Sequence, residues 1–189
     1  MRILMLGNSF TYFNDMPDIL AHLLDCEVVA HTRGGAYLAE QLNPETEMGA
    51  RTLKALREEK WDYVVMQEQS NAPALKRDAF QRSAAALCEL IHQNGAKPVF
   101  YVTWAYRDGT DKLASTGLTY DEMHQQLYDS YHAAAEAGQA LTADVGVAFN
   151  AVRHQVDVLN KTDNFHPSEA GSVLAAAVIA QTIRADQAK

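Results

Sequence analysis

Five short β-rich runs alternate with helical patterns along the 189 residues of this chain. The runs comprise residues 2–6, 26–32, 62–67, 97–104 and 142–147. Strands that alternate with helices in this way form a parallel sheet whose two faces are both covered by helices. We therefore expect an α/β fold, a three-layer α/β/α sandwich around a five-stranded parallel sheet.

Composition sets limits on the number of domains and on the partners of the chain. The hydrophobic fraction of 48% is enough for one sizeable core, and the sequence has no repeat or low-complexity segment, so residues 1–189 are expected to form a single domain. The formal net charge is -8, with 16 basic residues among 24 acidic ones. Nucleic-acid binding requires a basic face, so no nucleic-acid partner is expected.

Cysteine usage and the start of the chain bear on its compartment. Cys26 and Cys88 are too few and too far apart to indicate a disulfide framework or a zinc site. Met1 and Arg2 lead directly into the first strand, without the regions of a signal peptide, and no apolar stretch is long enough to span a membrane. We expect a cytoplasmic protein with no membrane partner, although a leader removed before Met1 would leave no trace in these residues.

Ser9 stands at the carboxyl end of the first predicted strand, in Gly7-Asn8-Ser9-Phe10-Thr11. Open α/β sheets bind their ligands at this edge, where a strand turns into a helix. A serine in such a turn can instead cap the helix and have no chemical role. Ser9 alone therefore leaves two interpretations open.

The stretch Asp163–Ser168, just before the last predicted helix, favours the chemical interpretation. It contains a carboxylate, Asp163, and an imidazole, His166, three residues apart. A serine hydroxyl is a weak nucleophile that needs a base within reach and a third group to orient that base. We expect Ser9 to be the nucleophile, His166 the base and Asp163 its orienting group. Of the other histidines, only His31 lies outside a helical pattern, and it is a weaker candidate for substrate contact.

Acyl transfer also needs hydrogen-bond donors for the oxyanion. The backbone N–H groups of Ser9 and Gly35 are two candidates, each following a different predicted strand. The third predicted strand ends in the polar run Gln67–Asn71, which supplies a side-chain amide from Gln69 or from Gln67. Gln69 is favoured because it lies further out of the sheet, and Gln67 stays open because residues two apart can face the same way.

In their order along the chain these blocks resemble those of the SGNH (GDSL-like) hydrolases, a superfamily of esterases and lipases. Gly7-Asn8-Ser9 matches the Gly-Asp-Ser block with asparagine in place of aspartate. Gly35 matches the glycine block, and the stretch Asp163–Pro167 matches the terminal Asp-x-x-His-Pro block.

The third block departs from the superfamily pattern. Where Gly-x-Asn-Asp is usual, this chain has Gln67-Glu68-Gln69-Ser70. Alignment from the end of the strand sets Gln69 against the asparagine, so an amide is retained. In this glutamine-rich block the chain resembles the carbohydrate-esterase branches of the superfamily. Taken together, its blocks resemble those of an uncharacterised bacterial subgroup.

The resemblance implies a flavodoxin-like sheet with strand order 2-1-3-4-5 and a serine esterase that works without a metal or cofactor. The expected reaction is removal of a short, acetyl-like acyl group from a carbohydrate or similar small polar ester through an acyl-enzyme. The alternatives are a lysophospholipase or thioesterase on longer acyl chains, and a non-catalytic binding protein on the same scaffold. Scattered hydrophobes do not distinguish a monomer from an oligomer, so the sequence makes no prediction of oligomeric state.

Two other folds with a similar strand–turn–helix opening do not fit. An α/β-hydrolase would carry a Gly-x-Ser-x-Gly elbow, which this chain lacks. A Rossmann nucleotide binder would carry Gly-x-Gly-x-x-Gly after its first strand, and residues 7–11 do not have this spacing.

Overall fold

The sheet in the computed structural model, which describes residues 1–189, has the strand order β2-β1-β3-β4-β5. Every neighbouring pair of strands is parallel. The strands are β1 (Arg2–Gly7), β2 (Glu27–Thr32), β3 (Tyr63–Met66), β4 (Lys97–Tyr101) and β5 (Leu141–Ala143). The predicted α/β class, the five parallel strands and the flavodoxin-like order are confirmed.

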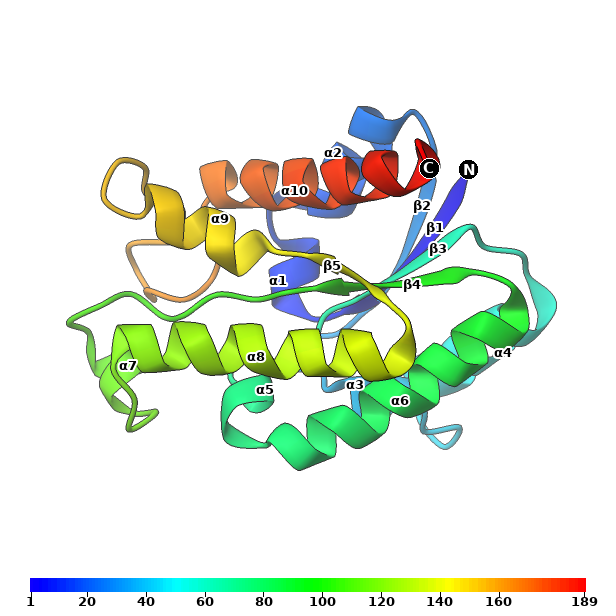
Figure 1. The fold of residues 1–189 in the computed structure, drawn as a ribbon, viewed down its shortest axis with the longest axis horizontal. Helices are drawn as coiled ribbons and strands as arrows, with labels where there is room; N and C mark the ends of the chain where they lie inside the picture. Colours follow the sequence, from blue (N-terminus) through cyan, green and yellow to red (C-terminus); the bar gives the residue numbers. More distant parts are fainter.

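Long helices cover both faces of this sheet (Figure 1). Successive residues of β1 point to opposite faces, yet Ile3 to Leu6 are all fully buried because each face carries its own core. One face packs against α2 (Met16–Leu24) and α10 (Glu169–Gln187), and the other against α4 (Glu47–Glu58), α6 (Arg77–Asn94) and α8 (Tyr120–Gly138). None of the helices combines the length and apolar character that a membrane crossing requires.

Side-chain caps fix the starts of the two longest helices. Thr119 and Glu122 form the capping box of α8, in which the Glu122 carboxylate accepts the Thr119 backbone N–H at 2.8 Å. Ser168 caps α10 by accepting the Gly171 N–H at 3.1 Å, so that helix begins at Glu169, immediately after its cap. Both caps satisfy amides that have no partner within the helix.

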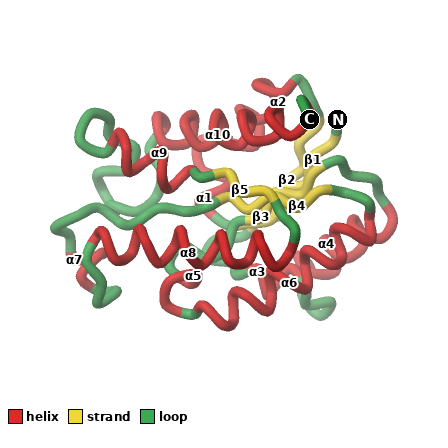
Figure 2. The backbone as a smooth tube through the Cα atoms, in the orientation of Figure 1, coloured by secondary structure: helices red, strands yellow, loops and turns green.

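The short elements gather where the strands end. These are α1 (Ser9–Tyr12), the 3-10 turn η1 (Phe13–Asp15), α3 (Leu38–Gln41), α5 (Ala72–Leu75), α7 (Asp111–Ala114) and α9 (Val145–Val152). Figure 2 shows long irregular segments between β4 and α8 and between α9 and α10 at the same end of the molecule. The strand-to-helix turns therefore meet at one edge of the sheet, the edge that binds ligands in open α/β folds.

The structure corrects the expected end of the fifth strand. The apolar run predicts a strand to residue 147, but β5 ends at Ala143 and α9 begins at Val145. The Gly146 N–H bonds the Val102 carbonyl at 3.0 Å, and a Cβ at Gly146 would collide with the Thr103 carbonyl. A short apolar run does not distinguish a strand from a buried helix, and here the close approach of α9 to the chain after β4 decides the outcome.

Candidate active site

Ser9, His166 and Asp163 form one hydrogen-bonded chain. The Ser9 Oγ lies 2.8 Å from the His166 Nε2, and the His166 Nδ1 lies 2.9 Å from the Asp163 Oδ2. Ser9 and His166 are 157 residues apart in sequence. Ser9 opens α1 and His166 precedes α10, so the fold itself brings the two ends of the chain to one point.

Asn8 fixes the turn that presents Ser9. Its side-chain oxygen accepts the Phe10 N–H at 3.1 Å, which caps α1, and its amide nitrogen donates to the Ala36 carbonyl at 3.1 Å. An ionised aspartate can accept but cannot donate. The asparagine at this position therefore joins the Ser9 turn to the loop after β2, a contact that the aspartate of the usual block could not make.

The loop that carries Asp163 and His166 is held against the segment after β4. The Trp104 indole donates to the Phe165 carbonyl at 3.0 Å, and the Arg107 backbone N–H donates to the Asn164 carbonyl at 2.9 Å. Asn164 has a φ of 65°, a left-handed conformation that asparagine tolerates better than most residues. These bonds give the loop a defined path although it is neither helix nor strand.

Hydrogen bonds keep Asp163 ionised. Burial raises the pKa of this carboxyl, but the backbone N–H groups of Phe165 at 3.0 Å and of His166 at 2.9 Å, together with the imidazole, outweigh burial and bring the pKa below its usual range. A charged Asp163 favours the His166 tautomer with its proton on Nδ1. Nε2 is then free to accept the proton of the Ser9 hydroxyl.

Aromatic rings enclose the imidazole of His166. Phe13 stacks on it with centroids 4.3 Å apart, Phe165 lies at 4.1 Å, and Phe10 contacts it edge-on at 5.7 Å. Phe10 in turn stacks on Trp104 at 4.4 Å. Packing on several sides restricts the rotation of the imidazole, so its two nitrogens stay directed at Ser9 and Asp163.

A pocket of about 310 Å³ opens in front of Ser9. Gly35 and Gln69 line it, as do the side chains of Tyr12, Phe13, Ser70 and Phe165. The backbone N–H groups of Ser9 and Gly35 donate to no acceptor within the protein. Gly35 has a φ of 68°, and no atom lies within 4 Å of where its Cβ would be, so the backbone there is open to a ligand.

The two candidate glutamines have different surroundings. The Gln69 amide nitrogen lies 3.2 Å from the Ser70 Oγ at the wall of the pocket. Gln67 is only 1% exposed and does not line the pocket. Its side-chain oxygen accepts the Asn8 N–H and the Thr11 hydroxyl, both at 3.0 Å, and its amide nitrogen donates to the Glu68 carbonyl. The structure thus brings Gln69, and not Gln67, to the pocket of Ser9.

Two features of the site were not expected from the sequence. One is that aromatic side chains surround His166, and the other is that His31 lies away from the pocket. The run Phe10-Thr11-Tyr12-Phe13 directly after Ser9 is a visible signal in the sequence that aromatic rings surround the site, and it was missed. His31 is buried against α4, where its Nδ1 lies 2.9 Å from the Thr52 hydroxyl, and burial lowers its pKa to about 4. It lies outside the pocket of Ser9.

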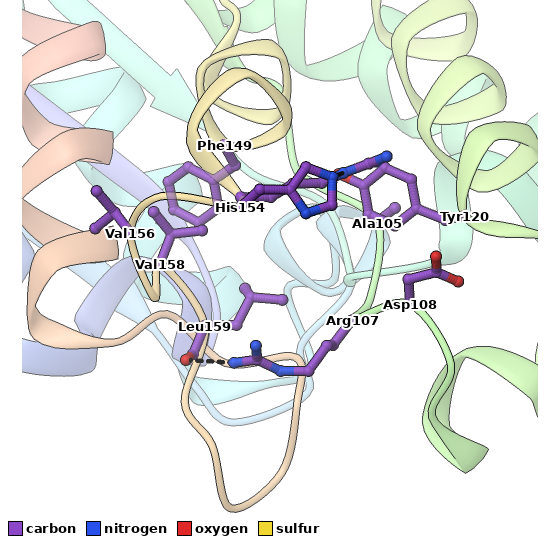
Figure 3. A pocket seen from close by; sticks show the side chains of 10 residues that line it. Ala105, Arg107, Asp108, Tyr120, Phe149, His154, Val156, Val158 and Leu159 are labelled. Atoms are coloured by element: carbon purple, nitrogen blue, oxygen red, sulfur yellow. Dashed lines mark hydrogen bonds between the residues drawn. The ribbon is translucent and has the colours of Figure 1, made fainter.

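A second pocket of about 300 Å³ is lined by residues of the segment after β4, by Tyr120 and by residues between Phe149 and Leu159, and contains no serine, threonine or cysteine (Figure 3). The Arg107 guanidinium donates to the Leu159 carbonyl at 3.0 Å, the bond drawn dashed in Figure 3. The Arg153 guanidinium lies 3.8 Å from the centre of the Tyr120 ring. Both guanidinium groups thus make contacts within the protein, although the buried Arg107 Nε has no hydrogen-bond partner. Nowhere in the chain do three or more histidine, cysteine or acidic side chains gather as a metal site would require.

Comparison with known proteins assigns the family. Neither protein-family models nor curated protein sequences give a match. Among solved structures, a protein from Slackia heliotrinireducens assigned to the SGNH hydrolases is 51% identical, with a TM-score of 0.93. The match covers 97% of this chain and 98% of that one.

More distant structures share the fold. A protein from Desulfitobacterium hafniense, described as lipolytic and of the G-D-S-L family, is 18% identical with a TM-score of 0.72, and the match covers 96% of this chain and 98% of that one. A catalytic mutant of an acetylxylan esterase from Geobacillus stearothermophilus is 17% identical with a TM-score of 0.66, over 96% of this chain and 93% of that one. With the close relationship to the Slackia protein, we conclude that the chain belongs to the SGNH hydrolases, a superfamily of enzymes that cleave ester bonds.

Proposed function

We propose that the protein is a serine esterase that removes a short, acetyl-sized acyl group from a carbohydrate or similar polar ester. The observation that carries the proposal is the hydrogen-bonded chain from the Ser9 Oγ through His166 to Asp163, with distances of 2.8 and 2.9 Å. In this proposal Ser9 is the nucleophile, His166 the general base and Asp163 the group that orients the imidazole. The reaction proceeds through a covalent acyl-enzyme.

Each proton has a defined place in the proposed reaction. As the Ser9 Oγ bonds to the ester carbonyl carbon, its proton passes to the His166 Nε2, and the carbonyl oxygen becomes an oxyanion. The bond from carbon to the leaving alcohol then breaks, and His166 returns the proton to that alcohol. Water repeats the sequence on the acyl-enzyme: His166 takes its proton, the acid is released, and the Ser9 hydroxyl is restored.

The oxyanion in this mechanism is bound by the backbone N–H groups of Ser9 and Gly35 and by the side-chain amide of Gln69. The two backbone groups have no acceptor within the protein, and all three residues line one pocket. Donors fixed in advance stabilise charge that develops only in the transition state. Gln67 is not included, because its side chain is engaged with Asn8, Thr11 and Glu68 beneath the pocket.

The proposed substrate class rests on the shape and lining of the pocket. At about 310 Å³ it fits a small group, and it combines aromatic faces with the polar side chains of Gln69 and Ser70. Tyr12 at its rim is 39% exposed and is available to contact a sugar ring. A structural neighbour that is an acetylxylan esterase agrees with this class at the level of fold analogy.

A panel of esters tests the proposal. We would measure hydrolysis of p-nitrophenyl esters from acetate to palmitate and of acetylated xylo-oligosaccharides by the wild type, by Ser9→Ala and by the exposed-serine control Ser115→Ala. We expect the highest kcat/KM for acetyl esters, loss of hydrolysis in Ser9→Ala and wild-type rates in Ser115→Ala. Equal rates in Ser9→Ala and wild type would contradict the mechanism, and a preference for palmitate would contradict the short acyl group.

A further inference from the structure

Glu68 is a buried acid between the two glutamines of the third block. It is only 2% exposed and does not line the pocket of Ser9. Its Oε1 accepts two backbone N–H groups, that of Leu38 at 3.1 Å and that of Gln69 at 2.6 Å. The Glu68 backbone N–H is itself bonded to the Tyr131 hydroxyl at 3.1 Å, which fixes the point from which the side chain extends.

These two bonds connect loops that follow different strands. Leu38 comes shortly after Gly35, on the segment that follows β2, and Gln69 lies on the segment that follows β3. No strand register connects these segments, because β2 and β3 are separated by β1 in the sheet. Glu68 therefore bridges the Gly35 loop and Gln69 across the width of one strand.

Its neighbour Gln67 makes the matching connection to the Ser9 turn. The Gln67 side chain accepts the Asn8 N–H and the Thr11 hydroxyl on either side of Ser9. Three consecutive residues thus have three tasks: Gln67 binds the turn after β1, Glu68 binds the loop after β2, and Gln69 faces the pocket.

We propose that Glu68 is a positioning residue of the oxyanion hole, whose ionised carboxylate holds the Gly35 loop and the Gln69 backbone at a fixed spacing that loosens on protonation. The statement that Gly35 and Gln69 donate to an oxyanion rests on the proposed function. The bridge made by the Glu68 carboxylate does not rest on that function, because it consists of hydrogen bonds within the fold.

The negative charge of Glu68 strengthens its hydrogen bonds to the Leu38 and Gln69 N–H groups. Protonation removes this charge and weakens these bonds. Hydrogen bonds to an ionised acceptor are about twice as strong as neutral ones. Burial raises the pKa of Glu68 to about 7, against the opposing effect of the Gln69 and Leu38 N–H groups. Of the charged groups that face it, Glu40 raises the pKa further and Lys76 lowers it, while burial keeps Tyr131 neutral. The carboxyl therefore changes charge in the neutral pH range.

A purely structural role would not account for an acid at this position. A buried carboxylate is expensive to desolvate, and glutamine offers the same acceptor oxygen without the charge. The two roles predict different behaviour of Glu68→Gln. A structural acceptor is replaced without kinetic effect, whereas a charged bridge is weakened in the transition state.

Steady-state kinetics of Glu68→Gln distinguish these roles. We expect kcat for acetyl-ester hydrolysis at pH 8 to fall about tenfold, with KM within about twofold of wild type, because the donors act on charge present only in the transition state. The contribution of Glu68 to the pH dependence of kcat near pH 7 should also disappear. Asp186→Asn is the matched control, since Asp186 bridges Tyr63 at 2.8 Å and Lys97 at 2.6 Å at the opposite end of β3 and β4. It should leave kcat unchanged, and an unchanged kcat in Glu68→Gln would overturn the proposal.

An NMR titration tests the bridge without any substrate. In the wild type the backbone amide protons of Leu38 and Gln69 should shift together with one midpoint near pH 7, and in Glu68→Gln neither should titrate there. If the wild type hydrolyses no ester while these amides titrate together, the proposed function fails and the bridge stands. If the two amides do not share a titration, the bridge is refuted whatever the hydrolytic activity.

Discussion

The ring of Phe13 lies face to face with the imidazole of His166, with centroids 4.3 Å apart and planes 14° from parallel. Removing this face in Phe13→Ala gives the imidazole more freedom to turn away from Ser9. A stacked aromatic pair is worth about 1 kcal/mol, so we expect kcat to fall roughly fivefold. Steady-state kinetics on an acetyl ester measure the effect, and Phe13→Tyr, which keeps the stacked ring, should retain most of the rate. Wild-type kcat in Phe13→Ala would show that the stack does not hold the imidazole.

Ser9→Ala and His166→Ala should each abolish ester hydrolysis to a similar extent, because nucleophile and base act as one unit. The double variant should then be no slower than either single one, and kcat/KM for all three is the measurement. Asp163→Asn should be milder, since the asparagine oxygen can still accept from the imidazole. A double variant much slower than both single variants would mean that Ser9 and His166 act independently.

Gln69→Ala should lower kcat by about a hundredfold to a thousandfold and change KM little, as expected for loss of one oxyanion donor. The exposed Gln125, whose amide bonds Asp129 on the surface of α8, supplies the control Gln125→Ala with unchanged kinetics. If Gln69→Ala raises KM and leaves kcat intact, its amide binds the substrate rather than the oxyanion.

Gln67→Ala should lower the free energy of unfolding of the protein. Its loss leaves the Asn8 N–H and the Thr11 hydroxyl without their buried acceptor, which costs about 1–3 kcal/mol for each unsatisfied group. Chemical denaturation should show a lower free energy of unfolding than in Gln69→Ala. A variant as stable as wild type would mean that water replaces the lost acceptor.

The stability of the protein should depend on the ionisation of Glu68. Its pKa of about 7 in the folded state lies above the ordinary value of 4.5, so between these values the folded protein binds the extra proton. The contribution of Glu68 to stability is therefore fully present below pH 4.5 and is lost as the pH rises through 7. Glu68→Gln does not titrate, so at about pH 8 it should exceed the wild type in free energy of unfolding by at most about 3 kcal/mol. The difference should shrink toward about pH 5, and denaturation curves at the two pH values provide the test.

Local patterns predicted the five strands and placed Ser9, Asp163 and His166 in turns beside predicted strands and helices, because strand periodicity and the position of polar residues are local properties. The strand order came from the resemblance to the SGNH hydrolases. Such patterns favoured Gln69 over Gln67 only through its greater distance from the strand and did not show which way either side chain points. β3 ends at Met66, so the alternation of side chains stops just before both residues.

The aromatic run after Ser9 indicates rings near the site, but local patterns do not show that Phe13 stacks on His166. It depends on a turn in which Asn14 and Asp15 both have a φ of 54°, and on the bond from the Asn14 amide to the Ser172 hydroxyl at 2.8 Å. These contacts join residues 158 apart in sequence. Only the assembled tertiary structure creates them.

The distance of 157 residues between Ser9 and His166 has a consequence for synthesis on the ribosome. The N-terminal part of a nascent chain emerges and begins to fold first, at about 5–20 residues per second. The Ser9 turn, the Gly35 loop and Gln69 are therefore all exposed before the imidazole has been translated. Under the proposed mechanism, a growing chain cannot cleave esters until the Asp163–His166 loop has been made, so hydrolytic activity can begin only after all five strands of the sheet have been translated.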